Sequence, residues 1–242
     1  MATNELVNNI AHQHLKVITE RSAQYGDNVW YTATFPDEFR SIQGYYPIFF
    51  TKDPDTGKFF SAALFGFEQG DNLFLTDNHW DAGYIPLTIQ RQPFSIGQQT
   101  INDGGTSVEQ RVLHIDIDNP RVNTDHGQAL FLEYGGNSEY LERMADMLEI
   151  IHHGLLDNDT FIEQLISLAL LEPFTLDVQL NNGTQHQMIG FYTINEDNLY
   201  DLPAETIATL HQQGYLAAIY MTIASQSCIR DLMNRKNSKL GI

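Results

Sequence analysis

The sequence predicts an α+β fold, with a mainly antiparallel N-terminal β-sheet and a helical C-terminal half that carries a β-hairpin. Short segments rich in aromatic and β-branched residues, which are typical of strands, fill the first half. Short polar turns join them, and such turns favour antiparallel pairing because parallel strands need a long crossover. Beyond residue 137 the apolar residues recur at helical spacing instead.

The N-terminal half contains five predicted strands, at residues 28–35, 46–53, 58–67, 72–76 and 111–118. The second and third should form a hairpin, because the segment DPDTG between them offers Pro and Gly for a tight turn. Just before the last strand lies the polar stretch GQQTINDGGTSVEQ, at residues 97–110. We expect a mobile loop there.

The first predicted helix of the C-terminal half begins near residue 138 and has apolar residues along one face. The pair His152-His153 should lie at its end, just before Gly154. A capping box formed by Thr160 and Glu163 then predicts the start of a second helix.

The remaining segments are a hairpin and two helices. An Asn-Gly pair at residues 182–183 predicts the turn of the hairpin, and helices are expected over residues 203–213 and 215–233. No solvated linker separates the two halves, so we predict a single domain over residues 1–242. A division into a β-rich part, residues 1–134, and a helical part, residues 135–242, is the alternative.

The composition is strongly acidic. The chain has 31 Asp and Glu against 13 Lys and Arg, a formal charge of −18, which repels phosphate backbones and anionic lipids. No apolar run is long enough to span a bilayer, no signal peptide is recognisable, and the single cysteine, Cys228, cannot form an intrachain disulfide. These features predict a soluble cytoplasmic protein that neither binds nucleic acid nor inserts into membranes, and they leave the oligomeric state open.

A possible metal site lies in the segment VLHIDIDNP. His114 and Asp116 are two residues apart on a predicted strand, so their side chains point to the same face. With a distant histidine they would complete the ligand set of a non-heme iron oxygenase. Alternatively, Asp116 and Asp118 cap the turn that ends the strand. None of the candidate third ligands stands in a distinctive motif, so we predict no metal and no cofactor. Those candidates are His126, His152, His153, His186 and His211.

The segment from DNHWDAGYIP to RQPF is the better candidate for a binding site. Its predicted ligand-binding residues are Trp80, Tyr84, Arg91 and Phe94. Arg91, flanked by aromatic residues and prolines, could bind a carboxylate through two parallel hydrogen bonds. The alternative is that Trp80 and Phe94 are core residues and that Arg91 pairs with Asp77 or Asp81. Phosphate-binding loops and nucleophile elbows are absent from the sequence, and no serine or cysteine has an evident base, so no catalytic residue is predicted.

The same segments resemble the bacterial SapC family over about residues 9–235. The resemblance lies in YYPIFF, NLFL, the spaced element W-DAGYIP…RQPF, HIDIDNPRV and the closing GFYTINEDNLYDLPAETI. The family name implies an association with surface layers. The genes that accompany those of the family imply instead a role beside TonB-dependent receptors, halogenase-like enzymes and cupin-type oxygenases. No catalytic mechanism comes with the resemblance.

We therefore expect a non-catalytic accessory protein that recognises a protein, peptide or small ligand in such an uptake or modification pathway. Its partner would be a halogenase-like or oxygenase-like enzyme or a TonB-dependent receptor system. A metal-dependent oxygenase built on His114 and Asp116 is the first alternative, and a surface-layer component is the second.

Overall fold

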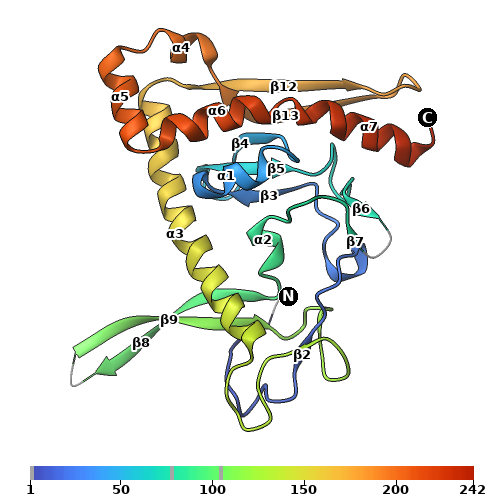
Figure 1. The fold of residues 1–242 in the computed structure, drawn as a ribbon, viewed down its shortest axis with the longest axis vertical. Helices are drawn as coiled ribbons and strands as arrows, with labels where there is room; N and C mark the ends of the chain where they lie inside the picture. Colours follow the sequence, from blue (N-terminus) through green and yellow to red (C-terminus); the bar gives the residue numbers. More distant parts are fainter. Residues whose placement is uncertain (1–2, 77–78, 104–105) are drawn as a thin grey trace.

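The structure, a computed structural model, describes residues 3–76, 79–103 and 106–242. The predicted α+β class is confirmed, because antiparallel sheets dominate the N-terminal half and helices the C-terminal half (Figure 1).

The largest sheet joins the two halves of the chain. Its order is β12 (Leu171–Gln179), β13 (Gln185–Ile194), β4 (Ile48–Lys52), β5 (Phe59–Leu64) and β3 (Tyr31–Thr34). The predicted hairpins β4–β5 and β12–β13 both form, and all pairs are antiparallel. The second hairpin adds to the first where Phe191 pairs with Thr51 and Tyr192 with Phe50. The C-terminal hairpin therefore extends the N-terminal sheet.

The described residues also form three smaller sheets. They are β1 (Asn4–Leu6) with β9 (Thr106–Asp116) and β8 (Phe94–Asp103), β2 (Lys16–Val17) with β10 (Val122–Asn123) and β11 (Gln128–Ala129), and β6 (Leu75–Thr76) with β7 (His79–Trp80). The prediction of a loop over residues 97–110 is wrong, because β8 and β9 form a long hairpin that projects from the body (Figure 1). Exposed residues such as Gln98 and Gln99 give its outer part no apolar alternation to reveal a strand.

Helix α3 (Glu139–Ser167) is continuous through the two positions where a break was predicted. The Ser138 hydroxyl begins it by accepting from the Leu141 N–H. Gly154 does not end it; the ring of Phe35 lies so close that a Cβ at Gly154 would be 2.3 Å from a ring carbon. Thr160 lies inside the helix, so the predicted capping box is wrong. A tertiary contact, rather than a helix end, explains the glycine.

The other helices are short. They are α1 (Pro36–Ile42), α2 (Leu87–Gln90), α4 (Glu196–Tyr200), α5 (Ala204–Gln212), α6 (Tyr215–Ser225) and α7 (Cys228–Leu240), with a 3-10 turn at Ala23–Tyr25. The helix predicted over residues 215–233 is interrupted between α6 and α7, where the Ser225 hydroxyl accepts from the Ile48 N–H of β4. In Figure 1, α1, α6 and α7 lie over the central sheet. None of the helices in the described ranges is long and apolar enough to cross a membrane.

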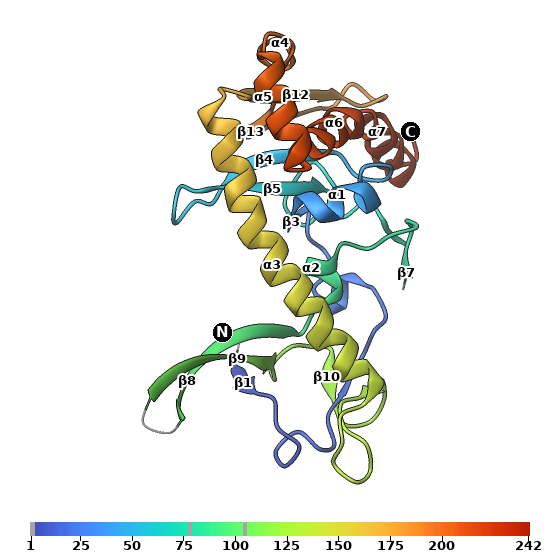
Figure 2. The same cartoon turned by 60° about the vertical axis from the view of Figure 1, so that its left-hand side comes forward.

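Two hydrophobic clusters make up the interior of the part of the chain that the structure describes. One lies between the central sheet and α1, α5, α6 and α7; the other lies under β8 and β9 beside the N-terminal half of α3. Helix α3 supplies Phe161 and Leu165 to the first cluster and Tyr140 and Leu148 to the second, and it runs the length between them (Figure 2). A boundary at residue 134 does not separate these clusters, and the single-domain organisation stays a prediction.

Candidate functional site

Trp80 and Phe94 are core residues in different clusters. Trp80 is 6% exposed, stacks on Phe74 and donates its indole N–H to the Tyr46 hydroxyl at 2.7 Å. Phe94 is fully buried and packs near Tyr140. The two aromatic side chains thus fix the beginning and end of the candidate segment, and neither lines the cavity described below.

Tyr84 is half-buried and belongs to a hydrogen-bonded group around Glu38. Its hydroxyl donates to Glu38 Oε1 at 3.1 Å, and the N–H of Leu87, the first residue of α2, donates to the same oxygen at 2.7 Å. Thr34 donates to the other carboxyl oxygen at 2.7 Å. Burial raises the pKa of Glu38, and these three donors oppose that rise. Glu38 therefore holds the start of α2 in place.

Arg91 directly follows α2 and is half-buried. One of its guanidinium nitrogens donates to the backbone oxygen of Phe94. Asp81, one of its predicted partners, instead pairs with Arg235 at 2.7 Å, and Asp77, the other, lies outside the described residues. Burial lowers the pKa of Arg91, and no carboxylate in the described ranges opposes that shift.

Arg91 faces a cavity of about 440 Å³ between β3, α2, β8 and α3. Most of its wall is apolar, from Val29, Ile89, Ile96, Leu148, Ile151 and Leu155. The Thr88 hydroxyl donates to the Ala33 oxygen at 2.7 Å and lies 2.9 Å from the Thr32 hydroxyl, which therefore donates to it. Arg91 is the one permanently charged residue among the lining residues that the structure describes.

His114 and Asp116 lie on β9 as predicted, but Asp116 is used at the end of the strand. Its Oδ1 accepts from the Thr3 N–H at 3.0 Å and from the Asp118 N–H at 3.3 Å. The His114 ring covers Gly97 on the neighbouring strand, where a Cβ would be 2.4 Å away. Over the described ranges, no three metal-binding side chains come together. The contacts of Asp116 are those of a turn-capping residue.

A buried charge cluster was not found by sequence reasoning. Asp27 and Arg121 are both fully buried and form an ion pair, and Arg21 approaches the same carboxylate at 3.3 Å. Arg121 also donates to the backbone oxygens of Ile18 and Glu20, and Arg21 to that of Ile89. The only sequence signal was the scarcity of basic residues, which makes each arginine in this acidic chain unusual.

The comparison with known families gives one result. The sequence model of the SapC family matches residues 7–232 of the 242. Neither a curated protein nor a solved structure matches the chain.

Proposed function

Because the chain belongs to the SapC family, we propose that it is a non-catalytic accessory protein, and that it binds a small apolar carboxylate in the cavity beside Arg91. The observation that carries the proposal is a half-buried guanidinium without a carboxylate partner among the described residues, at the edge of an apolar cavity.

The charge of Arg91 favours an anionic ligand. A guanidinium has five N–H donors in a planar fork that matches a carboxylate, and the backbone of Phe94 uses only one nitrogen. Partial burial weakens solvation of the guanidinium, so an anion placed beside it would be held more strongly than at an open surface. The net charge of −18 would discourage anions elsewhere on the protein.

The walls favour an apolar body attached to that carboxylate. The cavity of about 440 Å³ falls within the range of sites for small organic ligands, which are mostly apolar with a few fixed polar groups. Ser95 and His152 also line it, but no hydrogen bond joins them in the described structure, as a nucleophile and its base would require. The cavity is therefore better suited to binding than to acyl transfer.

The family resemblance suggests the pathway in which the protein acts. We propose that the bound ligand, or a peptide carrying such a group, links this protein to a halogenase-like or oxygenase-like enzyme or to a TonB-dependent receptor system. The alternative of an iron oxygenase gains no support from His114 and Asp116, whose contacts are those of a strand and its turn. The alternative of a surface-layer component rests on the family name.

Calorimetric titration with octanoate and with octanol tests the ligand class. Octanoate should bind measurably and octanol much more weakly. Arg91→Gln should raise the Kd for octanoate about thirtyfold, since a hydrogen-bonded charge is worth about 2 kcal/mol. Arg91→Lys should recover only part of the affinity, because an ammonium cannot form the paired hydrogen bonds.

Arg230→Gln is the matched control, since it makes the same charge change at an exposed position away from the cavity. It should leave octanoate affinity unchanged. Equal binding of octanol and octanoate, or equal loss of affinity in the Arg91 and Arg230 variants, would contradict the assignment of the site. Failure of octanoate to bind would contradict the ligand class.

A further inference from the structure

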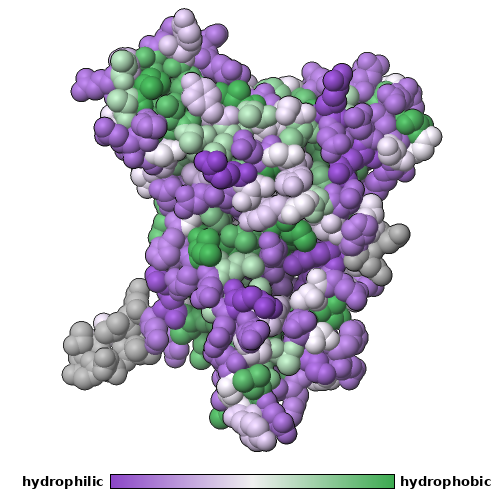
Figure 3. Space-filling view, viewed as in Figure 1, coloured by the Kyte–Doolittle hydropathy of each residue, from purple (hydrophilic) through white to green (hydrophobic). Residues whose placement is uncertain are grey.

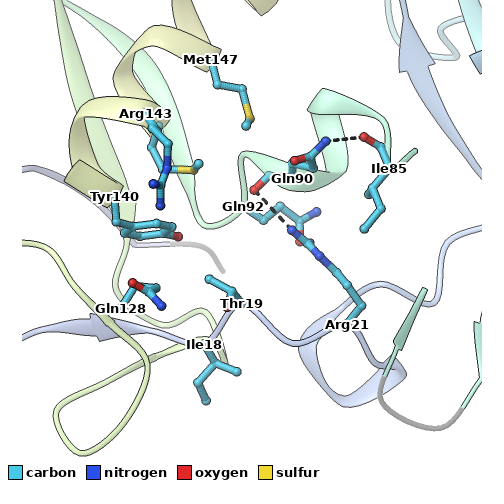
Figure 4. Close-up of a pocket in the computed structure, with 11 residues that line it drawn as sticks. Ile18, Thr19, Arg21, Ile85, Gln90, Gln92, Gln128, Tyr140, Arg143 and Met147 are labelled. Atoms are coloured by element: carbon cyan, nitrogen blue, oxygen red, sulfur yellow. Dashed lines mark hydrogen bonds between the residues drawn. The ribbon is translucent and has the colours of Figure 1, made fainter. Parts of the chain in front are cut away.

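A second cavity, of about 460 Å³, lies between α2, the N-terminal half of α3 and the segment that follows β2. Figure 4 shows Arg143 and Tyr140 on one side of it, Arg21 on the other, and Gln92 between them. Figure 3 shows hydrophobic residues across the middle of this face of the molecule, with strongly hydrophilic residues next to them. The cavity shares only Gln92 with the cavity beside Arg91.

The wall of this second cavity carries an excess of positive charge. Among the described residues, Asp27 is the one carboxylate that pairs with both Arg21 and Arg121, so this group of three charges has a net charge of about +1. Arg143 adds another positive charge at the cavity mouth, and the described residues that line the cavity include no Asp or Glu. Although the chain has 31 acidic residues, none of those in the described ranges balances this local positive charge, so the cavity would attract an anion from outside the chain.

The Tyr140 hydroxyl is a further donor. Tyr140 is 6% exposed, and burial raises its pKa to about 12, although Arg21, Arg121 and Arg143 all act to lower it. It is therefore protonated at neutral pH. Its hydroxyl faces the cavity in Figure 4 and makes no hydrogen bond within the described part of the chain.

Amide side chains complete the polar lining. Arg21 is held in place by the backbone oxygen of Ile89 at 3.1 Å, and the Gln90 side chain donates to the oxygen of Ile85. Gln92 and Gln128 line the cavity without such a bond to the residues that are described. A primary amide both donates and accepts, which matches the N–H and C=O of a peptide group.

We propose that this cavity is a second binding site, distinct from that of Arg91, and that it takes the carboxyl end of a peptide. The terminal carboxylate lies between Arg143, Arg21 and the Tyr140 hydroxyl, and Gln92 and Gln128 bind the adjoining peptide groups. Met144 and Met147, whose flexible side chains adapt to varied shapes, contact a side chain of the peptide.

The test uses the full chain and two pools of short N-acetylated peptides of randomised sequence. One pool has free carboxyl ends and the other is amidated. Saturation-transfer NMR should show contact with the free-acid pool and little with the amidated pool. Arg143→Gln should lower the affinity for the peptides that show contact about tenfold, and Tyr140→Phe should lower it about fivefold, because each change removes one donor to the carboxylate.

Arg230→Gln again provides the matched control and should leave peptide binding unchanged. Octanoate binding at Arg91 should also survive Arg143→Gln, which shows that the variant is folded and that the sites are separate. Equal contact with both pools would overturn the proposal, as would binding of inorganic phosphate with no contact to either pool, since that describes a plain anion site. Peptide affinity unchanged in Arg143→Gln would overturn the placement of the carboxylate.

Discussion

The buried pair of Asp27 and Arg121 predicts a large and specific loss of stability for Asp27→Asn. Both residues are fully buried, and the Asp27 carboxylate accepts from Arg121, from Arg21 at 3.3 Å and from the Ser22 N–H at 2.9 Å. The asparagine amide has one acceptor oxygen and presents an NH₂ group to donors. Arg121 would remain buried without its counter-charge.

Breaking a buried ion pair from one side costs about 3–5 kcal/mol, because the remaining charge stays desolvated. That is a large part of the roughly 5–15 kcal/mol by which a typical protein is stable. Urea unfolding should therefore show a much lower midpoint for Asp27→Asn with an unchanged slope. Asp201→Asn, at an exposed position, is the control and should change the free energy of unfolding by less than about 0.5 kcal/mol.

A double variant tests the pairing itself. Asp27→Asn combined with Arg121→Met should cost less than the sum of the two single changes, because the second change removes the charge that the first leaves unpaired. A loss below about 1 kcal/mol for Asp27→Asn, or strict additivity in the double variant, would refute the reasoning.

Two further predictions concern α1 and α3. Burial raises the pKa of Glu38 above its ordinary value of 4.5. The stability that the protonated Glu38 contributes is therefore fully present below pH 4.5 and is lost as the pH rises through the raised pKa. The Glu38→Gln variant should not show this loss. Urea unfolding at several pH values checks it, and a pH-independent difference between the two proteins would count against it. Gly154→Ala should destabilise by about 1–3 kcal/mol despite the better helix propensity of alanine, because its Cβ meets the buried Phe35 ring. Gly44→Ala, where a Cβ meets nothing within 4 Å, should be neutral by thermal unfolding.

Most of the central sheet was predictable, because its strands are rich in aromatic and β-branched residues and its two hairpins carry turn residues in the connecting loops. The projecting β8–β9 hairpin was not, since described residues such as Gln98, Gln99 and Gln110 are polar and exposed and do not alternate with apolar residues. Helix α1 had a readable start, with Pro36 in its first turn followed by Asp37 and Glu38. The sequence did not predict this helix, because the segments on either side of it have the patterns of strands.

The candidate sites were only partly predictable. Arg91 stood out because an arginine between aromatic residues and prolines is unusual in so acidic a chain. Trp80 and Phe94 were predicted to bind the ligand because they belong to the same motif, but both are buried and pack in the core. Arg21 and Arg143 are far apart in sequence and line the same cavity only because α3 packs near the N-terminal segment, so no local spacing could indicate them.

The unbroken course of α3 has a consequence for dividing the molecule experimentally. Its first half supports the cluster under β8 and β9, and its second half supports the cluster beside the central sheet. A cut within α3 would leave each fragment with a frayed half-helix and an uncovered apolar surface. Slow amide hydrogen exchange should therefore be lost from both clusters in one cooperative event, and expression of either half alone should yield aggregation-prone material.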